Sequence, residues 1–322
     1  MPAIGRWKWN TCLLFAVCVG AAASEQAIEL RTGSGALAGT LSLPKASGPV
    51  PVALIIAGSG PTDRDGNAPG MKNDSLRLLA QGLADAGVAS VRFDKRGVAA
   101  SVAAVAKEAD LRFDTYIDDA TAWLAMLKAD KRFSHVSVVG HSEGALIGML
   151  AAKAGDAKAY VSIAGVARGA STVLREQLAT ALPAPLDKES ERILAELEAG
   201  REAVKVPPEL ATLYRPSVQP YLISWFRYVP ATAIKDLKMP VLLVQGSTDL
   251  QVAVSEAGLL HKAKPDAQLV VVKGMNHVLK EAPPDKASQT PMYIDPKFPL
   301  APTLVPAVAG FLNKVSKETQ IK

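Results

Sequence analysis

The stretch "SVVGHSEGALIGM", residues 137–149, decides the fold of this chain. It begins as an apolar run typical of the end of a buried strand, and from Ala145 it resumes with residues typical of a packed helix. Between the two, Gly140 and Gly144 flank Ser142 in a G-x-S-x-G pattern. Glycine removes side-chain bulk where a turn is too tight for it. A serine on a tight turn from strand to helix predicts an exposed nucleophile.

The rest of the chain alternates predicted strands with predicted helices. This alternation indicates βαβ units and a mostly parallel central sheet with flanking helices, so we expect an α/β fold. A proline-rich segment near the end is expected to be an ordered surface loop, at 283–302. The predicted strands are 27–31, 36–43, 50–57, 88–93, 136–139, 160–163, 241–245 and 269–272, and the main predicted helices are 73–86, 113–130, 145–152 and 301–314.

One long segment interrupts the alternation. Residues 167–238 are charged, helical in pattern and without a clear strand. That is too long for a plain connection between two elements. We therefore expect a helical cap inserted between two parts of one core domain, residues 24–166 and 239–322. The alternative is that the segment packs elsewhere as ordinary scaffold.

The N-terminal segment has the pattern of a signal peptide. Arg6 and Lys8 precede an apolar run at 12–19, and small residues follow at 20–24. The run is shorter than the roughly 20 residues that span a bilayer. We expect residues 1–23 to be cleaved, which predicts a periplasmic or secreted protein with no stable membrane insertion. An uncleaved anchor and a disordered tail are the alternatives.

Cysteine use and charge exclude several classes of function. Both cysteines, Cys12 and Cys18, lie in the predicted signal peptide, so the mature chain would have none. This suits an oxidising compartment and excludes a cysteine nucleophile. Cleavage would remove Arg6 and Lys8 and change the net charge from +5 to +3. This mild charge, without a basic stripe, gives nucleic-acid binding little support.

A serine nucleophile needs an adjacent base, and the chain has four histidines. In this type of site the chain order is serine, then acid, then histidine. His135 and His141 precede Ser142 and fail that order. His261 lies in a helical pattern. His277, in "KGMNHVLK" just after the last predicted strand, is the expected base.

The expected acid is Asp249, in "QGSTDLQV" after a predicted strand. There its carboxylate could orient the imidazole of His277 and stabilise the imidazolium. A plain turn-forming aspartate is the structural alternative. Asp266 is the main rival, but it precedes the last strand and so belongs to the opposite end of the sheet.

The oxyanion of an acyl-transfer reaction needs two preorganised donors. We expect one to be the backbone N–H of Glu143, the residue after the nucleophile. The other is expected in "AGSGPTDRDG" at 57–66, from the N–H of Ser59, with Gly60 as the alternative. The glycines of that loop allow the backbone to approach a substrate closely.

Three charged or aromatic groups have a structural and a functional interpretation. Residues 63–65 could contact substrate, but a hydrogen-bonded loop that fixes Ser59 is favoured. Residues 94–96 are expected to form a structural turn. In the cap, Trp225, Phe226 and Tyr228 could line an acyl pocket or form the cap's own core.

With these motifs in place, the sequence resembles an α/β-hydrolase, and more narrowly a bacterial carboxylesterase-like branch related to serine peptidases of the same fold. The resemblance implies the α/β-hydrolase fold, an acyl-enzyme route, and Ser142, Asp249 and His277 as a catalytic triad. Five motifs in the family's order carry it: "AGSGPTDRDG" at 57–66, "RFDKRG" at 92–97, "GHSEG" at 140–144, "QGSTDLQV" at 245–252 and "NHVLK" at 276–280. The chain departs from the usual pattern at Ala99, because a glycine often follows the position of Val98.

We therefore expect a serine hydrolase that acts on small carboxylic esters. No metal or organic cofactor is implied, because the sequence has no metal-ligand cluster and no G-x-G-x-x-G that opens a helix. A peptidase or thioesterase with the same triad remains an alternative, as does a β-lactam or lactone substrate. A non-catalytic binding protein on a hydrolase scaffold is the alternative from another class.

Overall fold

The computed structural model describes residues 24–320, and these contain one mixed sheet of eight strands. The predicted signal peptide lies outside the described residues. Strand order is β1-β2-β4-β3-β5-β6-β7-β8; β2 is antiparallel to β1 and β4, and every later pair is parallel. This confirms the predicted α/β class. The strands are β1 (Ser24–Thr32), β2 (Gly35–Leu43), β3 (Val50–Ile56), β4 (Ala89–Phe93), β5 (Phe133–His141), β6 (Tyr160–Ile163), β7 (Val241–Gly246) and β8 (Gln268–Val272).

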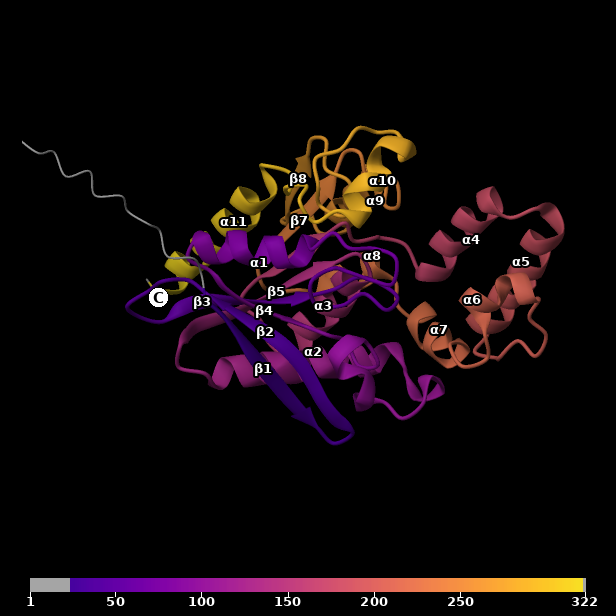
Figure 1. Cartoon of the computed structure of the whole chain (residues 1–322), viewed down its shortest axis with the longest axis horizontal. Coiled ribbons are helices and arrows are strands. Elements are labelled where there is room, and N and C mark those ends of the chain that lie inside the picture. The colour runs from indigo at the N-terminus through magenta and orange to yellow at the C-terminus, as the bar shows by residue number, and fades with distance from the viewer. Residues whose placement is uncertain (1–23, 321–322) are drawn as a thin grey trace, which may run out of the picture.

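Helices cover both faces of the sheet (Figure 1). In β3, Val52, Leu54 and Ile56 belong to the apolar cluster that includes α2 (Phe113–Ala129) and α3 (Glu143–Ala154). The alternate residues Ala53 and Ile55 belong to the cluster that includes α1 (Ser75–Asp85) and α11 (Leu304–Gln320). Successive strand side chains point to opposite faces, so a continuous apolar run is what a strand buried on both faces requires.

The remaining core helices differ in part from the prediction. α9 (Val254–Ala263) joins β7 to β8, and α10 (Lys286–Ile294) lies inside the segment predicted as a loop. The prediction of an all-loop segment at 283–302 was therefore wrong. The last helix also begins three residues later than predicted. No helix between residues 24 and 320 is long and apolar enough to cross a membrane.

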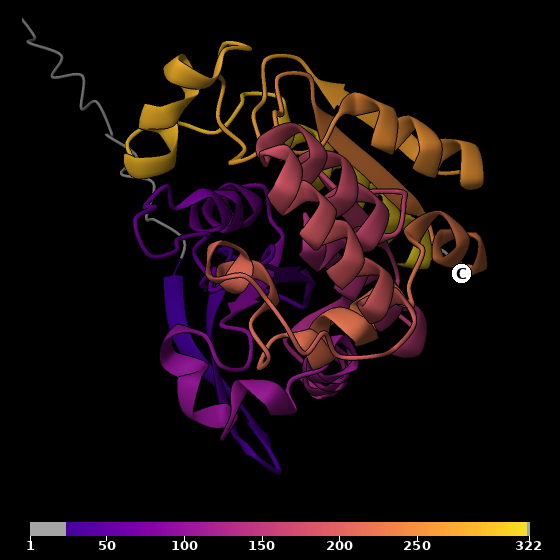
Figure 2. The same ribbon diagram turned by 90° about the vertical axis from the view of Figure 1, so that its right-hand side faces the viewer.

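All regular secondary structure between β6 and β7 is helical. Figures 1 and 2 show α4 to α7 gathered on one side of the molecule. These helices have an apolar cluster of their own, which includes Ile193, Leu197 and Tyr214. The elements are α4 (Ala170–Ala181), α5 (Ala184–Glu198), α6 (Ala211–Tyr214), α7 (Gln219–Phe226) and α8 (Pro230–Ala233), with short 3₁₀ turns at Pro208–Leu210 and Ile234–Asp236.

The turn from β5 to α3 holds Ser142 in a strained conformation. Its φ is 56° and its ψ is −121°, a backbone conformation that residues other than glycine rarely adopt. The flanking glycines are needed for close backbone approach. A Cβ on Gly140 would overlap the carbonyl oxygen of Gly144, and one on Gly144 would overlap that of Ile56. The Ser142 N–H donates to the carbonyl of Ile163 on β6 at 2.9 Å, which fixes the turn to the sheet.

The last residue of β5, His141, ties this turn to the loop after β8. Its Nε2 lies 2.9 Å from the carbonyl oxygen of His277. A carbonyl can only accept, so Nε2–H is the donor. Burial, followed by the neighbouring charge of His277, lowers the pKa of His141 to about 3. His141 is therefore neutral near neutral pH and acts as a structural support.

The first prediction concerns Gly144. Gly144→Ala should lower the free energy of unfolding by about 3 kcal/mol, because the added methyl meets backbone that cannot move aside. Urea unfolding measures this. The matched control is Gly258→Ala in α9, where a Cβ would meet nothing within 4 Å; it should stabilise the protein by about 0.5–1 kcal/mol. Equal effects of the two substitutions would contradict the packing argument.

The second prediction concerns His141 and acid. An unfolded histidine (pKa 6.5) binds a proton below pH 6.5, whereas native His141 stays neutral to about pH 3. Its contribution to stability is therefore complete above pH 6.5 and is lost as the pH falls from there towards 3, by at most about 1.4 kcal/mol per pH unit. His141→Gln keeps an amide donor but does not titrate, so its stability should fall less steeply below pH 6.5.

Urea unfolding of both proteins at a series of pH values checks this. Above about pH 7.5 the difference in stability between them should be constant, because neither residue 141 changes charge there. If the free energy of unfolding fell equally steeply below pH 6.5 in both proteins, His141 would not contribute in this way.

Candidate active site

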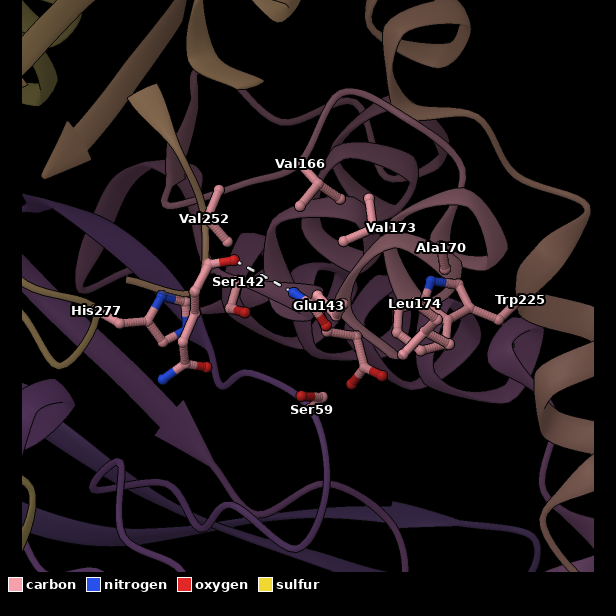
Figure 3. Close-up of a pocket in the computed structure, with 12 residues that line it drawn as sticks. Ser59, Ser142, Glu143, Val166, Ala170, Val173, Leu174, Trp225, Val252 and His277 are labelled. Atoms are coloured by element: carbon pink, nitrogen blue, oxygen red, sulfur yellow. Dashed lines mark hydrogen bonds between the residues drawn. The ribbon is translucent and has the colours of Figure 1, made fainter. Parts of the chain in front are cut away.

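Three predicted residues come together from the carboxyl ends of three strands. Ser142 follows β5, Asp249 follows β7 and His277 follows β8. The Nδ1 atom of His277 lies 2.8 Å from Oδ2 of Asp249. Ser142 and His277 line the same cavity, and Figure 3 shows Ser142 between His277 and Glu143. The serine, base and acid expected from the sequence thus meet at one edge of the sheet.

Asp249 is held as a buried hydrogen-bond acceptor, with a side chain only 1% exposed. Its Oδ1 accepts the backbone N–H groups of Gln251 at 2.8 Å and Val252 at 3.0 Å. Burial raises the pKa of Asp249, but the hydrogen bond and charge of His277 and these two N–H groups outweigh it, so the pKa is lowered. Since a carboxylate can only accept, Nδ1 of His277 carries the proton, and Nε2 of the neutral ring is left as an acceptor.

The cavity in front of Ser142 has a volume of about 140 Å³. Apart from Gln177 on α4, its polar residues come from the core. Most of its apolar wall comes from α4 and α7 and from the residues just before α4. The side-chain amide of Gln177, on α4, donates to the carbonyl of Gln251 at 3.4 Å and so connects α4 with the loop after β7. The apolar side chains that line it are Val166, Ala170, Val173, Leu174, Trp225 and Val252.

Both expected oxyanion residues line this cavity. Glu143 is the first residue of α3, where N–H groups have no acceptor within the helix. The N–H of Ser59 donates to no acceptor in the described range, 24–320. A Cβ on Gly58 would lie 3.2 Å from Cβ of Ser142, so this loop lies directly against the serine. Gly60, the alternative donor, is not among the cavity-lining residues.

A buried ion pair beneath the cavity was missed by sequence reasoning. Nζ of Lys95 lies 2.8 Å from Oε2 of Glu143 and donates to the carbonyl of Gly58 at 2.6 Å. The hydroxyl of Tyr221, on α7, donates to the other oxygen of Glu143 at 2.6 Å. Desolvation, followed by the nearby charge of Glu143, raises the pKa of Tyr221 well above its usual range. The sequence signal was a run of ionisable residues directly after a buried strand.

Asp94 and Arg96, the other two residues of the turn expected at 94–96, make structural contacts. Asp94 accepts hydrogen bonds from the backbone and guanidinium of Arg64. Arg96 pairs with Asp119 of α2. The loop expected at 63–65 is likewise held internally, because Oδ1 of Asp63 accepts the N–H groups of Asp65 at 2.9 Å and Asn67 at 2.8 Å.

The remaining residues singled out in the sequence lie partly at the cavity and partly away from it. Asp266 pairs with Lys264, away from the cavity. Of the three aromatic residues singled out in the sequence between β6 and β7, Trp225 lines the cavity. Phe226 packs on the apolar cluster of helices α4 to α7, and the hydroxyl of Tyr228 donates to Asp114. Among residues 24–320, no group of three or more histidine, cysteine or acidic residues could hold a metal ion.

Comparisons with known proteins agree with this arrangement. Residues 69–208 match the family described as serine aminopeptidase, S33. Esterase EstD of Thermotoga maritima is 29% identical over 246 residues, which are 76% of this chain and 58% of the length of that relative. The chain thus spans less than two thirds of the curated relative.

Solved structures show the same fold at low sequence identity. Est1E from Butyrivibrio proteoclasticus with bound ferulic acid has a TM-score of 0.60 and 17% identity, covering 92% of this chain and 100% of that one. The α/β-hydrolase GrgF from Penicillium sp. sh18 has a TM-score of 0.56 and 18% identity, covering 79% and 91%. With the strand order of the sheet and the serine at the turn after β5, these likenesses show that the chain has the α/β-hydrolase fold.

Proposed function

We propose that this protein is a serine hydrolase that cleaves carboxylic esters through an acyl-enzyme. The observation that carries the proposal is the contact of Asp249 with Nδ1 of His277 beside Ser142. This contact leaves Nε2 of His277 as the acceptor for the serine proton. A serine hydroxyl is a weak nucleophile without such a base.

The reaction follows from these positions. Ser142 Oγ attacks the ester carbonyl while His277 takes its proton. The tetrahedral intermediate collapses, and His277 returns the proton to the leaving alcohol. Water, activated by the same imidazole, then attacks the acyl-enzyme and releases the acid. Asp249 stabilises the imidazolium in both steps. The N–H groups of Ser59 and Glu143 are the proposed donors to the oxyanion.

The lining of the cavity favours a neutral, apolar acyl group. Its apolar wall offers no charged partner, and a volume of about 140 Å³ suits a small group. The relative EstD is named an esterase, and Est1E has been solved with ferulic acid bound. These relatives support an ester substrate for this chain.

The aminopeptidase alternative, suggested by the description of the matched family, would need an anion for the substrate's free amino group. Glu143 is the only carboxylate among the described residues that line the cavity. Lys95 and Tyr221 already occupy both of its oxygens. We therefore favour an ester over a peptide with a free N-terminus.

We also propose that residues 1–23 are a signal peptide and that the mature protein is exported. The support is the sequence pattern of charged, apolar and small residues. N-terminal sequencing of protein recovered from the periplasm or medium should give a chain that begins near Ser24. A chain that still begins at Met1 would refute the cleavage.

The catalytic proposal predicts large losses of activity when a triad residue is removed. Ser142→Ala and Asp249→Asn should each lower kcat by about 10⁴-fold, the first because no nucleophile remains and the second because the imidazole loses its orientation. Hydrolysis of p-nitrophenyl esters from acetate to longer chains measures this. Within the series, short acyl chains should have the higher kcat/KM.

Matched controls lie outside the cavity. Ser134→Ala, at the opposite end of β5, and Asp266→Asn, the rejected acid, should both keep kcat close to that of the unmodified protein. Activity that persists in Ser142→Ala would refute the choice of nucleophile. A loss in Asp266→Asn with an active Asp249→Asn would refute the choice of acid.

A further inference from the structure

Lys95 joins the two segments that carry the proposed oxyanion donors. Its side chain is 2% exposed, and the charged amine donates to the carbonyl oxygen of Gly58 and to the carboxylate of Glu143. A buried ammonium is costly unless it is paired and hydrogen-bonded, so these contacts hold it firmly in place. The ring of Tyr116 lies 5.1 Å from Nζ and closes another side.

The contact with Gly58 fixes the direction of the Ser59 N–H. The carbonyl of Gly58 and the N–H of Ser59 belong to one planar peptide unit, and no described peptide bond is cis. In a trans peptide these two groups point in opposite directions. By holding the carbonyl on the Lys95 side, the amine turns the N–H of Ser59 to the other side of the peptide, and Ser59 lines the cavity.

The contact with Glu143 acts on the second donor. The carboxylate is held by Lys95 on one oxygen and by Tyr221 on the other, at 2.8 and 2.6 Å. The N–H of Glu143 directly follows the nucleophile. A side chain held at both oxygens restricts the backbone that carries it. One amine therefore sets the distance between the loop after β3 and the first residue of α3.

We propose that Lys95 is a positioning residue that holds the N–H groups of Ser59 and Glu143 towards the oxyanion of the transition state. This inference rests on the proposed esterase function. Lys95 lies behind the peptide groups and does not line the cavity. It acts through the two donors, so its contribution should appear in the transition state more than in substrate binding.

The test uses Lys95→Met, which keeps most of the length of the side chain and removes the charged amine. With p-nitrophenyl acetate, kcat should fall about 10- to 100-fold while KM changes less than about threefold, because misaligned donors lose only transition-state stabilisation. A trifluoromethyl ketone, which forms an oxyanion on the serine, should bind more weakly by about the same factor as the loss in kcat/KM. Active-site titration with a serine-reactive phosphonate gives the concentration of folded sites.

Lys264→Met is the matched control. Lys264 is also buried and also contacts a carbonyl and a carboxylate, those of Leu237 and Asp266, at 3.0 and 2.9 Å. It lies outside the cavity, so its loss should leave kcat per titrated site and ketone affinity close to those of the unmodified protein. If both lysine variants lower kcat per titrated site equally, the specific role of Lys95 is refuted.

Lys95→Met leaves Glu143 as a buried charge without its cation, which can prevent folding. A double variant that carries both Lys95→Met and Glu143→Gln no longer has this unpaired charge. It is compared with the single variant Glu143→Gln. The double variant should lose kcat relative to this reference by about the same factor. Unchanged kcat and unchanged ketone affinity would refute the role of Lys95. An unmodified protein that hydrolyses no ester would instead refute the proposed function itself.

Discussion

The contact between Gly144 and the end of β3 is the constraint on which the site depends. A side chain at this position would overlap the carbonyl oxygens of Ile56 and Ala57, so the start of α3 can pack against β3 only if residue 144 is glycine. That approach forces the sharp turn and the positive φ of Ser142. The same contact places the loop after β3 next to Ser142. The proposed nucleophile and the proposed oxyanion loop are therefore neighbours because the backbones of β3 and α3 are in contact.

Buried charge is the second constraint at this edge of the sheet. Asp249 with His277 and Lys95 with Glu143 are both nearly inaccessible to solvent. Removing one member of such a pair leaves its partner buried and uncompensated, which is costly. The two pairs approach Ser142 from different sides, one through the proposed base His277 and one through the proposed oxyanion loop. Buried contacts of this kind hold rigid the geometry that the proposed acyl transfer needs.

Local patterns made much of the fold predictable. The apolar runs of the strands and the glycines around Ser142 are short-range features, and each appears in the structure as expected. Asp249 and His277 each follow a predicted strand, and the parallel sheet brings the ends of those strands to one edge. Ala99, where the resemblance implies a glycine, has a φ of 43°, in the left-handed region that favours glycine.

What sequence reasoning missed depends on contacts between distant residues. Lys95 and Glu143 are 48 residues apart, and Tyr221 is 78 residues from Glu143. No periodicity reports such a contact, so the sequence predicts only a structural turn at Lys95. The helix α10 was missed for another reason. It contains Pro291, a residue normally taken to break a helix, and a proline-rich surrounding sequence predicts a loop.

The position of α7 connects substrate choice with catalysis in the proposed function. The same short helix supplies Trp225 to the cavity wall and Tyr221 to the carboxylate of Glu143. An acyl group that pushes Trp225 outward would act on the helix that also holds Glu143, and through it on the residue that follows the nucleophile. A group that fits would leave both in place. Rejection of oversized substrates would then take the form of a lower kcat as well as a higher KM, because a misfit disturbs the oxyanion donors as well as the acyl pocket.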